Sequence, residues 1–302
     1  MSASEQSEPA AALERRQRLR GIALMCGAVA GFACIDSSAK YLNHAMDVIQ
    51  VVWARYTFAF IFSTFISNPF TRPAIMRSAR PWLQIGRSTL VLVSTVLNVM
   101  ALRYLQLDQT VSIMFATPFL VAAMAGPLLG EWIGPRRWIA ISVGFLGVIV
   151  VMRPGAGGIH PAAILSVIGT VMYAMYIIST RILARTDSTE TTLFYSNVVG
   201  LVATTIALPF VWVMPTDPFV MLMMVACGGF GALGHFLLIA AHRLAPAAIL
   251  SPFIYTQLMW MILLGYLFFG DVPSRWTLGG AAIVIASGLY LLYREQKVRG
   301  EG

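Results

Sequence analysis

The chain has 302 residues, of which 58% are hydrophobic and only 11% are charged. A soluble domain carries charged residues at roughly a quarter of its positions, because much of the surface that contacts water is formed by charged side chains. The two lysines, Lys40 and Lys297, cannot supply that layer. The composition therefore excludes an ordinary soluble protein and indicates one that lies in a lipid bilayer.

Apolar runs interrupted by charges, proline and glycine predict ten transmembrane helices, at about 20 residues for each span. The connections between them are short, so any chemistry must take place among the helices. We place the spans, in chain order, at residues 20–42, 46–67, 82–102, 106–130, 136–152, 160–183, 190–213, 217–240, 246–269 and 275–293. The fold class predicted is thus an all-α membrane protein.

The two tails lie outside the spans. Residues 1–19 are polar and predict a disordered tail, with a cleaved signal peptide as the alternative, and residues 294–302 form a second short tail. Basic residues precede the first span and follow every even-numbered one, for example Arg15, Arg72 and Arg136. Because cytoplasmic loops collect arginine and lysine, both termini are expected in the cytoplasm of a bacterial cell, with the chain in the inner membrane. The same bias accounts for the net charge of +8 without a nucleic-acid partner.

An internal repeat is the most informative pattern in the chain. Gly130-Glu131 follows the fourth span, and Gly270-Asp271 follows the ninth, about 140 residues later. At the same offset Lys40 corresponds to Arg181. Five spans are an odd number, so the second half must insert upside down relative to the first. Inverted repeats are typical of secondary transporters, although repeats also occur in channels.

Two sequence blocks carry a resemblance to a known family. The first runs from Pro118 through Gly130-Glu131 to Trp138 and Gly147, and the second covers residues 245–257 with Gly270-Asp271. Both resemble the EamA domains of the drug/metabolite transporter superfamily, although Asp271 stands where the usual motif has glutamate. The resemblance covers residues 20–153 and 160–293. It implies two inverted five-helix repeats around a central cavity, and transport of a small molecule without ATP hydrolysis.

Within that superfamily, three segments are most similar to a proteobacterial subgroup that includes riboflavin importers. They are Trp53-Ala-Arg-Tyr, Gly234-His235 and residues 252–257. Riboflavin uptake is therefore the expected activity, with an amino-acid or drug exporter and a passive channel as alternatives. Enzymes are disfavoured, because the chain has no Walker A, His-Glu-x-x-His or Gly-x-Ser-x-Gly motif. Three cysteines spread over three spans, Cys26, Cys34 and Cys227, predict neither a disulfide nor a metal site, and no motif requires a cofactor.

Ionisable residues inside spans are the first candidates for a site, because a charge in hydrocarbon is costly unless it is paired or hydrated. Asp36 and Arg55 are predicted to form an ion pair or to face one water-filled cavity; a pair that only joins two helices is the alternative. Lys40, one helical turn after Asp36, could reach it or extend toward the membrane surface. Arg87, near the start of the third span, is expected to contact lipid head groups.

Neutral polar and aromatic side chains complete the candidate substrate or coupling site. They are Tyr56, Asn98, Thr117, Tyr173, Tyr176, His235, Tyr255, Gln257 and Trp260. Such a lining suits a flat ring that carries hydroxyl groups, provided that Asp36 and Arg55 satisfy each other; otherwise their charges suit an amino acid. His235 is expected to be a core histidine bonded to a neighbouring helix, or else a proton carrier, with protons as the coupling ion. Pro118 and Pro252 are predicted to break their helices and act as hinges.

Overall fold

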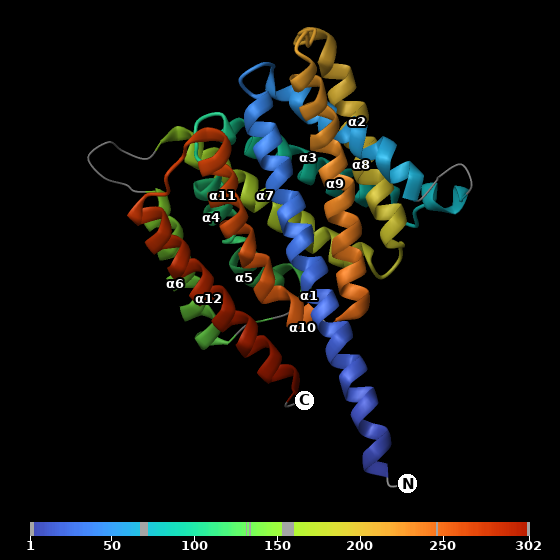
Figure 1. The fold of residues 1–302 in the computed structure, drawn as a ribbon, viewed down its shortest axis with the longest axis vertical. Coiled ribbons are helices and arrows are strands. Elements are labelled where there is room, and N and C mark those ends of the chain that lie inside the picture. Colours follow the sequence, from blue (N-terminus) through green and yellow to red (C-terminus); the bar gives the residue numbers. More distant parts are fainter. Residues whose placement is uncertain are drawn as a thin grey trace.

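The computed structural model describes residues 3–66, 72–130, 132, 134–152, 160–245 and 247–300. In these ranges the chain forms helices and no strand. The α-helices, shown in Figure 1, are α1 (Ala3–Leu42), α2 (Val48–Ile66), α3 (Pro81–Leu102), α4 (Leu107–Met114), α5 (Thr117–Leu129), α6 (Pro135–Met152), α7 (Pro161–Leu183), α8 (Thr189–Ala207), α9 (Pro218–Leu244), α10 (Ala247–Leu250), α11 (Gln257–Phe269) and α12 (Arg275–Gly300). Short 3-10 helices are η1 (Pro73–Met76), η2 (Leu208–Phe210) and η3 (Ser251–Thr256).

Eight segments of the described chain are long and apolar enough to cross a membrane. Two shorter apolar helices, Trp138–Met152 and Arg275–Leu291, occupy the places predicted for the fifth and tenth spans. The helix bounds agree with the predicted spans to within a few residues in most cases. The chain is therefore a multi-span helical membrane protein.

The first predicted tail differs from expectation, because α1 already begins at Ala3. The helix thus extends into the segment for which the sequence predicts a disordered tail. Alanine, arginine, glutamate and glutamine, which are frequent here, favour helix. The helix also continues into an apolar span, so these residues extend an existing helix and do not need to nucleate one.

The fourth and ninth predicted spans are each broken, as the two prolines predict. One break separates α4 from α5, and Pro118 occupies the first turn of α5. The other contains η3, with Pro252 in its first turn. Proline is favoured there because its missing N–H is not needed in the first turn of a helix. Both predicted proline positions thus coincide with helix breaks.

Each broken span ends on a glycine in the left-handed region. Gly130 follows α5 with a φ of 74°, and Gly270 follows α11 with a φ of 68°. A residue with a side chain is strained in this conformation, so both helices use the standard glycine end. The two halves therefore share their proline breaks and their glycine ends at corresponding positions.

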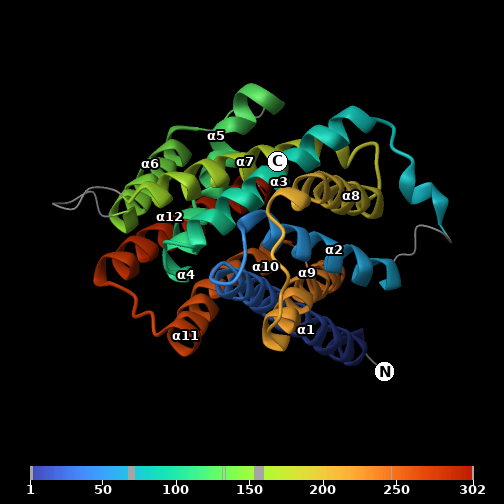
Figure 2. The same ribbon diagram turned by 90° about the horizontal axis from the view of Figure 1, so that it is seen from above.

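The most extensive contacts between helices join the two halves of the chain. α1 packs along α9, α3 along α7, and α6 along α12. Figure 2 shows these pairs running side by side, with α6 and α12 at one edge of the bundle. Because each pair takes one helix from either half, the halves are interleaved into one bundle.

The α6–α12 pair is held at a close crossing. A Cβ atom built on Gly280 would lie 2.6 Å from the carbonyl oxygen of Gly147, and one built on Gly147 would lie 2.9 Å from that of Gly280. The two backbones approach this closely only because both residues are glycine, as is common where membrane helices cross.

Candidate functional site

Asp36 and Arg55 do not form the ion pair that the sequence offered as one possibility. Both are described by the structure, and no nitrogen of Arg55 lies within 4.0 Å of the Asp36 carboxylate. Asp36, on α1, instead accepts a hydrogen bond of 3.1 Å from the side-chain amide of Asn98 on α3. The two opposite charges are therefore near each other but separate.

Arg55 of α2 lies near a group of polar side chains. Its charge acts on Asp36, Tyr56, Tyr173 and His235, which come from α1, α2, α7 and α9. Asp36 and Tyr173 are half-buried, whereas His235 is exposed.

His235 makes a different contact from the one expected of a core histidine. Within the described residues its ring nitrogens have no hydrogen bond to a neighbouring helix. The ring instead lies edge-on to Phe32 of α1, with 5.2 Å between centroids and an interplanar angle of 60°. His235 is thus held by an aromatic contact beside the polar group.

Two tyrosines and a second arginine extend the polar group toward α8. Tyr173 and Tyr176 stack on α7, with ring centroids 5.4 Å apart and planes inclined by 24°. The guanidinium carbon of Arg87 lies 4.5 Å from the centroid of the Tyr176 ring. A cation over an aromatic face at this distance is a favourable contact. Arg87 therefore joins the site that the sequence had assigned to other residues.

The predicted contact of Arg87 with lipid head groups is wrong, because this side chain is 1% exposed. From α3 it donates hydrogen bonds to Thr180 of α7 (2.7 Å), and to the Thr192 carbonyl and Ser196 hydroxyl of α8 (both 3.0 Å). A buried arginine needs several acceptors, and these supply them. Arg87 thereby links the first half of the chain to the second.

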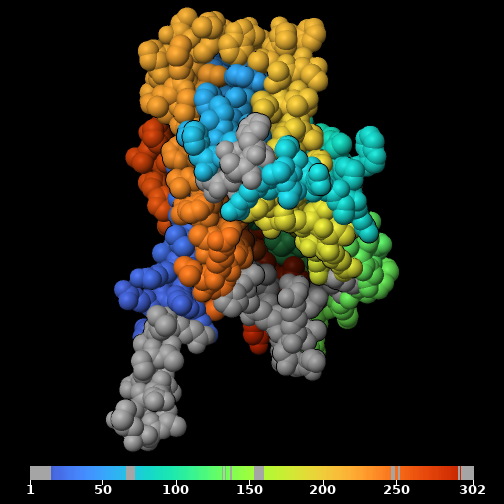
Figure 3. All heavy atoms as spheres, turned by 90° about the vertical axis from the view of Figure 1, so that its right-hand side faces the viewer, coloured from blue at the N-terminus to red at the C-terminus, as the bar shows by residue number. Residues whose placement is uncertain are grey.

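A second link between the halves involves Asp187, in the α7–α8 connection. Its carboxylate accepts hydrogen bonds from the Ser78 hydroxyl, the Ala79 N–H (2.9 Å) and the Gln84 amide (2.8 Å). Burial alone would raise the pKa of Asp187, but these hydrogen bonds outweigh it and lower the pKa below its ordinary value. Figure 3 shows the segment that leads into α3 (cyan) lying against α8 (yellow).

Lys40 forms a third link, with a partner that sequence reasoning missed. Its ammonium group lies 2.6 Å from Asp271, which follows α11, and donates to the Leu105 carbonyl at 3.2 Å. It also lies 4.9 Å from the centroid of the Phe269 ring. Lys40 therefore neither reaches Asp36 nor extends to the membrane surface. We call Lys40, Leu105 and Asp271 the Lys40 contact.

Asp108 lies next to the Lys40 contact and was also missed from the sequence. It is 3% exposed, and one of its carboxylate oxygens has no hydrogen-bond partner among the described residues. The charges of Lys40 and Asp271 both act on it. Lys40 and Asp108 are thus buried beside Asp271, which is partly exposed.

The remaining predicted residues gather at the helix breaks. Tyr255 of η3 lies edge-on to Phe115, with 5.0 Å between ring centroids, and Thr117 donates to the Met114 carbonyl at 2.6 Å. Gln257 is buried at the start of α11, and the indole N–H of Trp260 is buried without a partner among the described residues. These residues form a group of their own.

At the second break, the Thr256 hydroxyl of η3 lies 4.0 Å from the Cys26 sulfur of α1. Cys26 lies about 15 Å along α1 from Asp36, at 1.5 Å per residue. The contacts at this break therefore begin about three helical turns of α1 away from Asp36. Among the described residues, no cluster of histidine, cysteine and acidic side chains could hold a metal ion.

Comparison with known proteins agrees with this architecture. The model of the EamA-like transporter family matches residues 19–153 and again residues 160–294. A solved crystal structure superimposes with a TM-score of 0.61 over 91% of this chain and 99% of its own, at 17% identity, which shows a shared fold.

Several relatives of this chain carry one of two names. An S-adenosylmethionine uptake transporter of Rickettsia bellii is 28% identical over 87% of this chain and 89% of its own. A riboflavin transporter of Rhizobium johnstonii is 27% identical over 97% of both chains, and one of Vibrio cholerae is 27% identical over 94% of this chain and 96% of its own.

Proposed function

Because the chain belongs to the EamA-like transporter family, we propose that it is a secondary carrier that moves a small metabolite across the bacterial inner membrane. The proposed architecture is ten spans in two inverted five-helix repeats, with both termini in the cytoplasm. The matched ranges, the two proline breaks and the two left-handed glycines support it. The arginine-rich even-numbered connections support the orientation.

The observation that carries the proposal is a polar group between the halves, with contacts on either side of it that join the halves. In a ten-span chain the Lys40 contact lies at the outer face, whereas Asp187 and its partners lie at the cytoplasmic face. A carrier must open one face while the other stays closed. In such a cycle, the contacts that join the halves at one face would break while those at the other face form.

Riboflavin uptake is the first proposed cargo assignment. The tyrosines around Arg55 offer stacking faces, and Asn98 and Thr95 offer neutral hydrogen-bonding groups, which suit a flat ring with a polyol tail. Two relatives named riboflavin transporter match this chain over nearly its whole length. Protons are the proposed coupling ion.

One observation favours a second cargo. Asp36 and Arg55 are not ion-paired, so both charges remain to bind a molecule that carries an ammonium and a carboxylate group. S-adenosylmethionine has these groups together with a flat ring, and several relatives are named S-adenosylmethionine uptake transporters. On this alternative, Asp36 would face the ammonium group and Arg55 the carboxylate.

Uptake into inside-out and right-side-out vesicles tests the carrier assignment and the cargo together. Labelled riboflavin and labelled S-adenosylmethionine are supplied separately, with and without a proton gradient. Accumulation above the outside concentration supports a coupled carrier, whereas simple equilibration would indicate a channel. If Asp36 and Arg55 bind the charged groups of the cargo, Asp36→Asn should abolish S-adenosylmethionine uptake and leave most riboflavin uptake intact. Transport of neither compound, with the protein in the membrane, would refute both cargo assignments.

A further inference from the structure

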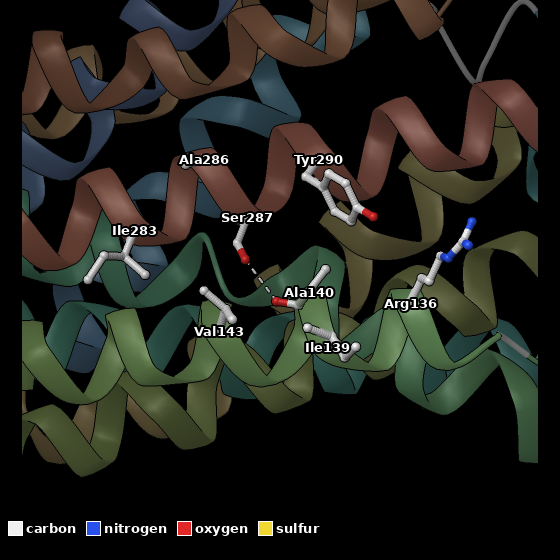
Figure 4. Close-up of a pocket in the computed structure, with 8 residues that line it drawn as sticks. All are labelled: Arg136, Ile139, Ala140, Val143, Ile283, Ala286, Ser287 and Tyr290. Carbon is white, nitrogen blue, oxygen red and sulfur yellow. Dashed lines mark hydrogen bonds between the residues drawn. The ribbon is translucent and has the colours of Figure 1, made fainter.

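A groove runs along the seam between α6 and α12, away from the polar group around Arg55. Its volume is about 430 Å³, and Figure 4 shows the side chains that line it from both helices. The lining residues are Arg136, Ile139, Ala140, Val143, Ile283, Ala286, Ser287 and Tyr290. None of the helices that carry Asp36, Arg55 or Tyr173 contributes to it, so the groove is not part of the proposed cargo site.

The groove follows from how the two helices cross. Their backbones approach closely at Gly147 and Gly280, and toward the start of α6 three small residues, Ala140, Ala286 and Ser287, lie among the larger ones that line the seam. The Ser287 hydroxyl donates to the Ala140 carbonyl at 2.8 Å, and Figure 4 shows this bond between the two helices. The bond satisfies the buried hydroxyl, so the remaining walls near it are aliphatic.

Polarity is distributed unevenly along the groove. Ile139, Val143 and Ile283 form apolar walls, and the ring of Tyr290 faces Ile139, whereas Arg136 lies at the end shown on the right of Figure 4. From Arg136 to Val143 the groove extends about 10 Å along α6. Arg136 lies in the first turn of α6 and is exposed, as expected at the cytoplasmic surface of the membrane.

We propose that this groove binds an anionic phospholipid of the cytoplasmic leaflet, with one acyl chain between α6 and α12 and the phosphate on Arg136. The apolar walls lie where the bilayer supplies acyl chains, and the cation lies where it supplies phosphate. Basic pockets between transmembrane helices on the cytoplasmic side recognise lipid head groups in this way. The N-terminal end of α6 adds the positive end of a helix dipole at the same place.

Native mass spectrometry of the detergent-purified full-length chain tests this site. The delipidated protein is titrated with dioleoyl-phosphatidylglycerol and, separately, with dioleoyl-phosphatidylcholine, which has the same acyl chains and no net charge. We expect phosphatidylglycerol to bind about fivefold more tightly, the factor given by about 1 kcal/mol for one basic residue at the surface. Arg136→Gln should remove this preference. Arg72→Gln, at an exposed arginine outside the groove, should leave it unchanged.

A second variant tests the apolar part of the groove. Ala286→Phe would fill the seam and should weaken binding of both lipids, while the melting temperature in detergent reports whether the bundle still folds. Equal binding of the two lipids by the unmodified protein would overturn the proposal. So would an unchanged preference in Arg136→Gln, or a dimer that cross-links through cysteines introduced at Ile139. None of these readouts depends on transport, so the outcome is independent of the proposed cargo.

Discussion

Replacing Lys40 by methionine should destabilise the protein more than any change to its partner. The ammonium group is the cation of a buried cluster that also holds Asp271 and Asp108, and the paired side chains are 11% and 21% exposed. Breaking a buried pair by removing one partner costs about 3–5 kcal/mol, because the remaining charge is uncompensated. Lys40→Met leaves two carboxylates without a cation, and partial exposure of Asp271 places the expected loss near the lower end of that range.

The partner variant should behave differently. In Asp271→Asn, Lys40 keeps its hydrogen bond to the Leu105 carbonyl, and Asp108 remains as a nearby carboxylate on which its charge acts. The expected loss is about 1.5–3 kcal/mol, the scale of one hydrogen bond to a charged group. The double variant Lys40→Met/Asp271→Asn should be more stable than the sum of the single losses predicts, because no ion pair is left half-broken.

Unfolding of the purified protein in detergent, followed by circular dichroism over a denaturant series, measures these differences. The charge exchange Lys40→Asp/Asp271→Lys serves as a further control, since it restores opposite charges at the same two positions. Equal losses in the two single variants, or strict additivity in the double variant, would refute the claim that Lys40 neutralises a shared acidic cluster.

Three further predictions address other parts of the bundle. Gly280→Ala should lower stability by about 1–3 kcal/mol, since its Cβ would lie 2.6 Å from the Gly147 carbonyl oxygen, whereas Gly279→Ala, with open space around it, should not; melting temperatures compare the two. Because the pKa of Asp187 is lowered in the folded protein, its carboxylate stabilises the fold above pH about 4, and this stabilisation is lost as the pH falls further. The difference in melting temperature between wild type and Asp187→Asn should therefore disappear below that pH. Arg87→Lys should destabilise the bundle although it keeps the charge, because a single ammonium group cannot donate hydrogen bonds to the acceptors on both α7 and α8. A melting temperature equal to that of wild type would contradict this prediction.

The sequence predicted the helices and their breaks well, because both have local causes. α3 begins at Pro81 and ends at Leu102, beside the predicted span 82–102, and Pro118 and Pro252 lie at the two breaks. Length, apolar runs and the missing N–H of proline act within a few residues of each other. Such signals can be read from a single sequence without knowing which helices meet.

The partners of the charged side chains could not be predicted in this way. Asp271 is far from Lys40 in the sequence, and only the packing of α11 against α1 brings them together. Asp36 lay one turn away on the same helix and was the nearer candidate. Arg87 resembled an interfacial arginine because its acceptors lie on α7 and α8, in the other half of the chain. Tertiary contacts between the halves decided both outcomes.

Under the proposed carrier function, the Lys40 contact has a consequence for the relative populations of an outward-closed and an outward-open conformation. On the proposed cycle, opening the outer face would separate Lys40 from Asp271. A difference of 1–3 kcal/mol between two conformations corresponds to a population ratio of about 5 to 150. The unloaded carrier would then rest mostly with its outer face closed, and cargo would bind from outside only to the minor population. The apparent affinity for external cargo would be weaker than the intrinsic affinity by that same ratio.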